Sequence, residues 1–585
     1  MVIKIDIMKV MNIIVFLLIA NFSTGQEFLN LDFEHEVLDS HLPKKWYLAG
    51  RGYKISIEEH EVIHGNKSLR IESSTANRGQ FGIFSNSLPI NYAINKTIEL
   101  KGKVKTYAVQ EGSAKIWCRV NTNDTSILGS DTLSNKELVG DNDWTEFSII
   151  MEVQGDVREV LFGGLLSGTG IALFDDFEVF IDGIKFKDVE PEIIIPSKEQ
   201  LAWLRKHIYP LKSFDPKFGN DEDLEIFSQL VGESKIVAFG ESAHGSSEIF
   251  QMKHRLIKYL TQNKDFNIFS IEANMPESYK INDYVFEGKG YVKSLIEGMH
   301  FWTWRTEEVL QMVEWMKVQN KTNKNIHFTG FDMQIIDESI NILATTFENQ
   351  AHLINEINTL KLTLTAVNGT EKTFESQILA KYDKEVTSKI FSTLKAAIQS
   401  ESNPKLDKEW LLRNLRILEQ FIVNNETFYS RDKFMAENIE WIYNQNPHSK
   451  IAVWAHNGHI KKTDDSMGAY LAQSFNEDYI AVGFTFNEGQ YTALGRKGLD
   501  TYPAQRSYPG TFEYIFNALE EPIFLLDLRK IRSDDSNDGL WFKKMLEFRN
   551  VGAVKVLNEF QPTNIFEDFD MLVFINESTN SKLLD

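Results

Sequence analysis

The chain has 585 residues with a net charge of −21, and 42% of its residues are hydrophobic and 25% charged. This length exceeds what one compact core supports, so two or more domains are expected. The acidic balance argues against a nucleic-acid partner, because no basic excess is available to neutralise phosphates. It also argues against binding to an anionic lipid surface.

The first 25 residues have the pattern of a secretory signal peptide. Lys9 precedes an apolar run at 13–20, and the small residue Gly25 suits cleavage before Gln26. The run is too short to cross a bilayer, and no later stretch is a better candidate. The sequence therefore predicts a bacterial protein that is exported to the periplasm or the medium and has no membrane span. The alternative reading of these residues is a buried N-terminal strand.

Residues 26–186 are predicted to form an all-β sandwich, because short β-prone runs recur there between turn residues without a helical period. The runs are Tyr53–Ile57, Ser68–Ser73, Thr97–Val104, Ala114–Val120, Glu146–Val153, Glu159–Leu165 and Phe177–Ile181. Residues 187–197, which include Pro191 and Pro196, have the composition of a linker. Cys118 is the only cysteine, so neither an intramolecular disulfide nor a cysteine zinc site can form.

From residue 198 to residue 585, apolar β-prone runs alternate with helical segments, which predicts βαβ units and a mainly parallel sheet. The expected strands are Ile236–Phe239, Ile268–Ile271, Ile326–Gly330, Ile451–Trp454, Ile480–Phe486, Ile523–Leu526 and Leu572–Ile575. Residues from about 335 to 446 contain helical patterns and no convincing strand. We therefore expect an α/β domain with a helical insertion.

Four of the expected strands are followed by ionisable residues. These are Glu241 and His244, Glu272, Asp332, and His456 with His459. Sites of open α/β sheets are built at the carboxyl ends of the strands, so these residues are predicted to meet in one active site. Any one of them alone is better explained as a helix cap or a residue of a solvated turn. Four strand ends together favour a site.

The chemistry that such a set supports is proton transfer. A histidine can take a proton from water as that water attacks a carbonyl, and a neighbouring carboxylate holds its tautomer. Glu241 and His244 suit these roles at a strand-to-helix turn. Ser242 is a weaker candidate, as a nucleophile, because the Gly-x-Ser-x-Gly elbow is absent. A metal site is the main alternative, since Glu-x-x-His and His-x-x-His offer ligands, although His-Glu-x-x-His is absent.

Other residues allow two readings. The residues Trp302, Trp304 and Arg305 either line a substrate cleft or pack against a helix N-terminus. Arg431 is either half of an ion pair or a charge in the cleft. Three other histidines are expected to be structural or surface residues: His254, His327 and His448.

Residues from about 200 to 580 resemble the erythromycin esterase family, whose motifs occur here in order. They are Gly240–Gly245, Ser270–Glu272, Thr303–Glu308, Gly330–Gln334, Arg431-Asp432 with Met435–Asn438, and Trp454–His459. The resemblance implies a three-layer α/β fold with a helical insertion over about 335–446. It also implies hydrolysis of an ester or lactone by an activated water, without a metal.

Matched residue by residue, the resemblance makes His244 the general base and Glu241 and Glu272 the essential carboxylates. His456 and His459 correspond to the paired histidines of the family. The residues expected to bind substrate are Trp304, Arg305, Asp332 and Arg431.

Two features separate this chain from the macrolide-resistance members of the family, which act in the cytoplasm. These are the predicted export and the additional β domain, so antibiotic resistance is only one of the functions that the resemblance allows. Through Asn30–Glu34 and Phe174–Phe177, the β domain resembles jelly-roll carbohydrate-binding modules. That resemblance implies a glycan ligand and a structural calcium ion, with Asp176 as a candidate ligand. The alternative is an accessory sandwich without a ligand.

The sequence leads to three hypotheses. The first is an exported carboxylic ester hydrolase in which His244 deprotonates water, Glu241 and Glu272 orient and balance charge, and His456 and His459 polarise the carbonyl or protonate the leaving alkoxide. The second is a metal-dependent hydrolase that uses the same groups as ligands. The third is a non-catalytic glycan-binding protein with a vestigial cleft, against which the intact motif set argues.

Overall fold

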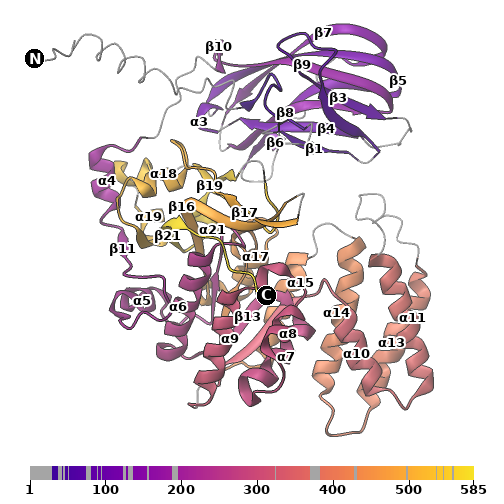
Figure 1. Cartoon of the computed structure of the whole chain (residues 1–585), viewed down its shortest axis with the longest axis vertical. Coiled ribbons are helices and arrows are strands. Elements are labelled where there is room, and N and C mark those ends of the chain that lie inside the picture. Colours follow the sequence, from indigo (N-terminus) through magenta and orange to yellow (C-terminus); the bar gives the residue numbers. More distant parts are fainter. Residues whose placement is uncertain are drawn as a thin grey trace, which may run out of the picture. The chain divides into compact units, whose positions relative to one another are not determined.

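The computed structural model divides into two compact units, Met1–Ile194 (unit 1) and Ile195–Asp585 (unit 2) (Figure 1). It describes residues 29–36, 42–43, 46–50, 52–73, 81–88, 90–93, 95–122, 127–128, 136–154, 157–186, 195–322, 325–368, 382–426, 431–495, 498–534, 536–543, 546–556 and 559–584. The predicted signal peptide and most of the predicted linker lie outside these residues. No helix in the described part is long and apolar enough to cross a membrane.

Unit 1 is rich in antiparallel strands, which confirms the predicted strand-rich first domain. The elements are β1 (Tyr47–Ala49), β2 (Lys54–Glu58), β3 (Ser68–Ser73), β4 (Phe81–Leu88), α3 (Ile90–Ala93), β5 (Lys96–Thr122), β6 (Ile127–Leu128), β7 (Leu138–Val153), β8 (Val157–Ser167), β9 (Thr169–Ile181) and β10 (Ile184–Lys185). The strand order is β1-β4-β8-β5-β9-β3-β2, with β6 and β7 paired to β5 and β10 paired to β9.

The long strand β5 belongs to both halves of this sheet. Its first part pairs with β9 and its last part pairs with β8. Although β4 and β9 are not neighbours in the strand order, the rings of Phe84 and Phe174 lie 4.9 Å apart. The two halves therefore pack face to face, as in a β-sandwich. The aromatic side chains buried between them are Phe33, Trp46, Phe84, Phe162, Phe174 and Phe177.

The carboxylates near the end of β9 have protein partners. Asp176 forms an ion pair with Lys103 at 2.9 Å, and Asp175 accepts hydrogen bonds from the main-chain N–H groups of Ile63 and His64. Within the described ranges, no group of three or more His, Cys, Asp or Glu side chains is arranged to hold a metal ion. Calcium binding by Asp176 stays a prediction.

Unit 2 is a mixed α/β unit around a nine-stranded sheet, ordered β11-β18-β21-β16-β12-β15-β13-β14 with β17 paired to β16. The strands are β11 (Ile208–Pro210), β12 (Ile236–Phe239), β13 (Phe266–Asn274), β14 (His327–Asp332), β15 (Lys450–Trp454), β16 (Tyr479–Gly495), β17 (Gly498–Pro503), β18 (Ile523–Asp527) and β21 (Met571–Ser578). A separate pair is formed by β19 (Leu546–Arg549) and β20 (Phe560–Thr563).

Neighbours from β21 to β14 are parallel, whereas β11, β18 and β17 pair in antiparallel fashion. All residues of β12 and β18 are buried, which explains why these strands are continuous apolar runs. The predicted alternation of strands and helices is confirmed. The three-layer arrangement implied by the family resemblance stays a prediction.

The helices along the sheet are α4 (Lys198–Leu204), α5 (Glu225–Val231), α6 (Ser247–Asn263), α7 (Met275–Glu287), α8 (Val292–Glu297), α9 (Glu307–Asn320), α16 (Asn457–Ile460), α17 (Met467–Phe475), α18 (Phe512–Asn517), α19 (Leu528–Arg532), α20 (Asn537–Leu540) and α21 (Ile565–Asp568). Short 3₁₀ turns are η2 (Glu222–Leu224), η3 (Trp302–Trp304) and η4 (Asn476–Asp478).

Helices fill the described chain between β14 and β15. They are α10 (Asp337–Thr346), α11 (Ala351–Asn368), α13 (Lys384–Ser400), α14 (Lys408–Glu426) and α15 (Arg431–Gln445). The first four lie side by side as a bundle (Figure 1) and share their own apolar core. Two charged residues, Arg431 and Asp432, begin α15, the helix that precedes β15.

Candidate active site

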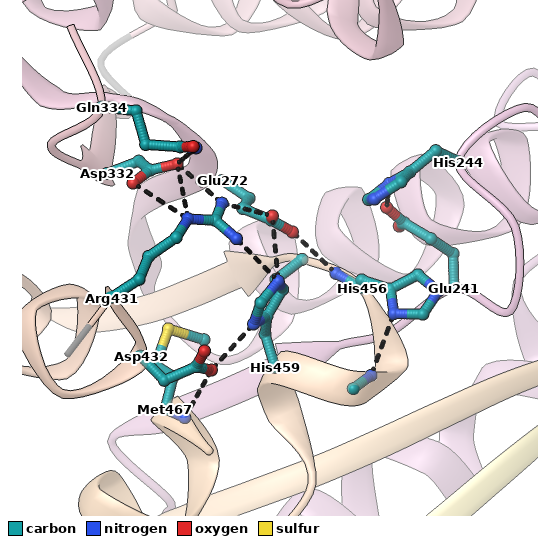
Figure 2. Close-up of polar contacts among 12 residues, drawn as sticks. Glu241, His244, Glu272, Asp332, Gln334, Arg431, Asp432, His456, His459 and Met467 are labelled. Carbon is teal, nitrogen blue, oxygen red and sulfur yellow. Dashed lines mark hydrogen bonds and ion pairs between the residues drawn. The ribbon is translucent and has the colours of Figure 1, made fainter. Parts of the chain in front are cut away.

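The strand order explains how motifs that are far apart in the sequence meet. β15 comes after β12, β13 and β14 in the chain but lies between β12 and β13 in the sheet. Trp454, at the end of β15, is opposite both Phe239 of β12 and Ile271 of β13. The residues just after these three positions therefore lie at the same edge of the sheet (Figure 2). They include Glu241, Glu272 and His456.

Close approach of backbone and side chain fixes this edge. A Cβ atom at Gly240 would lie 2.0 Å from Asn457 Oδ1, so glycine is required there. The Asn457 side chain bonds both the N–H and the carbonyl of Phe484, and its main-chain N–H donates to the carbonyl of Glu241 at 3.0 Å. Asn457 thus ties the ends of β12 and β15 to Phe484 in β16.

Glu241 and His244 form a buried pair at the start of α6 (Figure 2). His244 Nδ1 lies 2.8 Å from Glu241 Oε1, so Nδ1–H donates to the carboxylate. A neutral ring with its proton on Nδ1 has a free lone pair on Nε2, and His244 Nε2 has no hydrogen-bond partner among the described residues. The His244 side chain is 10% exposed, whereas that of Glu241 is fully buried. The pair therefore keeps one basic nitrogen available.

Lys253 of α6 holds the second oxygen of Glu241. Its ammonium donates to Glu241 Oε2 and, at 3.3 Å, to the carbonyl of Ala455. Its Nζ also lies 4.3 Å from the centre of the Trp454 ring. Burial of the fully buried side chain lowers the pKa of Lys253 to about 8, although Glu241 opposes this shift.

Arg431 lies between two buried carboxylates. Its Nη2 is 2.7 Å from Asp332 Oδ2 and 2.8 Å from Glu272 Oε1. Asp332 also accepts from the main-chain N–H of Met333 and the side chain of Gln334. Burial would raise the pKa of Glu272, but His459, Arg431 and His244 outweigh it and hold that pKa well below its usual range. Glu272 is therefore a carboxylate with cationic partners.

His459 is bound by carboxylates at both ring nitrogens. Nδ1 is 2.8 Å from Asp432 Oδ1, and Nε2 is 3.3 Å from Glu272 Oε1. Burial alone would lower the pKa of His459, but Glu272 and Asp432 outweigh it and raise the pKa to about 10. Arg431 Nη1 is also 3.0 Å from Nε2, a contact that suits only the neutral ring. In the protonated ring, Nε2–H donates to Glu272 instead.

His456 has both ring nitrogens engaged. Nδ1 accepts the main-chain N–H of Gly458 at 3.1 Å, and Nε2–H donates to the carbonyl of Val551 at 3.2 Å. Burial, together with the charges of His244 and His459, holds the pKa of His456 well below its usual value. The ring centre lies 5.0 Å from that of His244. His456 is thus an uncharged side chain that lies beside His244.

Trp304 lies beneath the site. It is 1% exposed, and its indole N–H donates to the carbonyl of Glu272 at 2.7 Å. Its ring packs edge-on against His244, so it supports both His244 and β13. Arg305 is half-buried, and its Nε has no hydrogen-bond partner in the described part of the chain.

Residues that the sequence set aside lie away from this chemistry. Ser242 is fully buried, and its Oγ has no hydrogen-bond partner within the described ranges. His254 is buried on α6 against Trp315, His327 begins β14 beside Phe286, and His448 is exposed.

Two residues of the site were missed by the sequence analysis. Lys253 had a signal, because it lies on the apolar stripe of α6, three residues from Phe250 and four from Ile257. Asp432 was recognised only as the neighbour of Arg431. Its partner His459 comes from a different motif, and nothing in the spacing connects the two.

The carboxylates of the site are already paired. Arg431 lies where a cation bound by Glu272 and Asp332 would lie, and His459 contacts Glu272 and Asp432. Among the described residues, no group of three or more potential ligands is arranged to hold a metal ion. A reaction without a metal stays a prediction.

Comparison with known proteins places this site in a family context. The putative hydrolase YbfO of Bacillus subtilis is 25% identical over 368 residues, which cover 56% of this chain and 80% of that protein. Erythromycin esterase type II of Escherichia coli is 23% identical over 335 residues, covering 50% of this chain and 78% of the relative. A crystal structure described as a succinoglycan biosynthesis protein has the same fold, with a TM-score of 0.57, 24% identity, and coverage of 66% of this chain and 98% of its own.

The family model for erythromycin esterase matches residues 261–578. The match begins after the Glu241–His244 pair and includes Glu272, Arg431, His456 and His459. It spans more than half of the 585 residues. The chain belongs to the erythromycin esterase family.

Proposed function

We propose that unit 2 hydrolyses a carboxylic ester or lactone with a water molecule activated by His244. The observation that carries this proposal is the Glu241–His244 pair, in which Nδ1–H is held by a buried carboxylate at 2.8 Å while Nε2 is unbonded within the described residues. A histidine held in one tautomer with its other nitrogen open is the arrangement that a general base needs.

The proposed reaction has two steps. Nε2 takes a proton from water as the water oxygen bonds to the carbonyl carbon, and the carbonyl π electrons move to oxygen. The resulting tetrahedral oxyanion then collapses and breaks the bond to the leaving alkoxide, which takes the proton from the His244 imidazolium. Glu241 stabilises that imidazolium between the steps. The products are a carboxylic acid and an alcohol, or a hydroxy acid from a lactone.

The contacts suggest different roles for the paired histidines than the sequence did. Both nitrogens of His456 and His459 are engaged by protein groups, so we assign them positioning roles. Arg431 is a better candidate for polarising the carbonyl. A guanidinium has five N–H donors. The contacts of Arg431 to Asp332 and Glu272 use Nε–H and Nη2–H, so Nη1–H is unused when His459 is protonated. Charged donors of this kind stabilise an oxyanion in a water-poor site.

We also propose that the reaction needs no metal, because the Glu272 and Asp332 carboxylates are paired with Arg431. The substrate class rests on the family, and macrolides are one lactone among those to be tested. From the pattern of residues 1–25 alone, we propose that the protein acts outside the cytoplasm. N-terminal sequencing of the mature protein tests this, with Gln26 as the expected first residue.

A panel of esters and lactones, macrolides included, tests the activity on wild type, His244→Gln and His327→Gln. His327 lies at the other end of β14 from Asp332 and serves as the control. We expect hydrolysis by wild type and His327→Gln, and a loss of about 10²- to 10⁴-fold in His244→Gln, the usual contribution of a general base. Wild-type rates in a folded His244→Gln protein would contradict the proposal.

Two further measurements separate the alternatives. A stoichiometric metal that is lost together with activity on chelation would establish the metal-dependent hydrolase instead. Glycan binding by the full chain with no hydrolysis of any panel member would favour the non-catalytic protein.

A further inference from the structure

We infer that Lys253 is a positioning residue of this site, whose ammonium group fixes the Glu241 carboxylate and thereby sets the proton affinity of the Glu241–His244 pair. The inference rests on the proposed function, because it gives Lys253 a part in the same reaction. Lys253 is not expected to touch the substrate, since its side chain is fully buried.

The position of Lys253 is unusual for a lysine. Its neighbours on the same stripe of α6, Phe250 and Ile257, are buried apolar residues. Burying an ammonium group costs several kcal/mol unless it is paired and hydrogen-bonded. Here the compensation comes from Glu241 Oε2, the carbonyl of Ala455 and the face of Trp454. All three partners lie at the ends of β12 and β15, so the lysine joins the two strand ends that carry the histidines.

The charges around Lys253 fix the direction of its effect. Glu241 faces it from the end of β12, and Glu272 attracts it from the end of β13. His244 shares Glu241 with it through the other carboxylate oxygen. A positive charge on one oxygen of Glu241 opposes the arrival of a second positive charge on the other side. The Lys253 ammonium therefore opposes the gain of a proton by the pair.

Removing this charge reverses the effect. In Lys253→Met, the buried Glu241 carboxylate has only His244 to neutralise it, so the pair keeps a proton to higher pH. Nearby charges shift pKa values by about one to three units. We therefore expect the acidic limb of the pH–kcat/KM profile to move to higher pH by at least about one unit. Lys253→Arg, which keeps a charge, should leave the limb close to that of wild type.

The experiment compares wild type, Lys253→Met, Lys253→Arg and Lys258→Met on the best substrate of the panel. Lys258 lies on the same helix but donates to the carbonyl of Pro216, so Lys258→Met is the matched control for losing a lysine from α6. We expect a shifted limb in Lys253→Met, a near-normal limb in Lys253→Arg and an unchanged limb in Lys258→Met. A folded Lys253→Met protein with the wild-type limb would overturn the inference.

A second measurement does not need turnover. NMR titration of labelled histidines, with His244 assigned through His244→Gln, follows the pair directly. In wild type, the His244 signals should show an inflection near pH 8 as Lys253 loses its proton, and Lys253→Arg should lack it. This comparison uses folded proteins even if Lys253→Met fails to fold. If the wild-type protein shows this inflection but hydrolyses no member of the panel, the proposed function is contradicted. The role of Lys253 in the Glu241–His244 pair is then unaffected. The same inflection in Lys253→Arg would overturn that role.

Discussion

Glu272 Oε2 accepts the main-chain N–H of His456 at 3.0 Å, so a side chain at the end of β13 fixes the backbone at the end of β15. The other oxygen of the same carboxylate contacts Arg431 and His459. One buried residue thus joins the strand end of the second histidine motif to the start of α15. Because both oxygens are engaged and its pKa is held well below the usual range, Glu272 is suited to anchoring. The base that we propose is His244.

The Arg431 guanidinium is expected to be essential for stability as well as for activity. In Arg431→Met, Glu272 and Asp332 lose the cation between them, and Asp332 is fully buried. Breaking a buried pair in this way costs about 3–5 kcal/mol. Urea unfolding of the variant should show a loss of this size, and ester hydrolysis should fall at least about 100-fold, as when a single oxyanion-stabilising donor is removed.

A double variant separates the lost ion pair from lost packing. In Arg431→Met with Asp332→Asn, one of the two stranded charges is gone, so part of the lost stability should return while activity stays low. Equal stability of the single and double variants would mean that the charge of Asp332 is not what Arg431 compensates.

Asp432 is expected to keep His459 protonated. Burial opposes the charged ring, and Glu272 with Asp432 raises the pKa to about 10. In Asp432→Asn, one of the two carboxylates is neutral, so the pKa of His459 should fall by about one unit or more. NMR titration of His459 measures this change. Asp464→Asn, which removes a carboxylate paired with Lys461 on the surface, is the control, and an unchanged His459 in Asp432→Asn would contradict the assignment.

The sequence identified the strand ends because their chemistry is local. Glu241, Glu272, Asp332 and His456 each follow a short apolar run, and a parallel sheet gathers such ends at one edge. The position of β15 between β12 and β13 could not be read in this way, since strand order in a sheet depends on long-range pairing. The hydrogen bond between His456 Nε2 and the carbonyl of Val551 could not be predicted either, because Val551 lies in a segment with no motif of its own.

The roles of the residues expected to bind substrate could not be decided from the sequence alone. The sequence left Trp304 and Arg431 with two readings each, and only contacts could distinguish them. Arg431 forms ion pairs with Glu272 and Asp332, and its role as a charge in a substrate cleft stays a prediction. Lys253 lies on the apolar stripe of α6. A lysine at such a position needs a buried partner, but the helix pattern does not identify that partner.

Trp304 is expected to act mainly through packing. Trp304→Phe removes the indole N–H that donates to the carbonyl of Glu272, and loss of a buried hydrogen-bond donor costs about 1–3 kcal/mol. We expect a loss of stability of this size in urea unfolding and a lower kcat, because the end of β13 is no longer held. Trp302→Phe, at a half-buried position in the same turn, should change both less. A raised KM with unchanged stability would instead support direct substrate binding by Trp304.

His254 is expected to make the protein sensitive to acid. Burial, with the charges of Lys258 and Lys217, lowers the pKa of His254 to about 3, whereas an unfolded histidine titrates near about 6.5. Between these values, the unfolded state binds the proton and the folded state does not, so stability falls as the pH falls. From pH ~7.5 to pH ~5, this single group should cost about 2 kcal/mol. In His254→Phe, that part of the pH dependence should be absent.

The matched control for His254→Phe is Ile257→Val, a change on the same helix at a buried position without an ionisable group. It should lower the free energy of unfolding by the same amount at both pH values, because it alters packing and binds no proton. As the pH falls, the free energy of unfolding of His254→Phe should therefore increase relative to that of wild type. The difference between Ile257→Val and wild type should stay constant. If His254→Phe keeps a constant offset too, a different group causes the acid sensitivity.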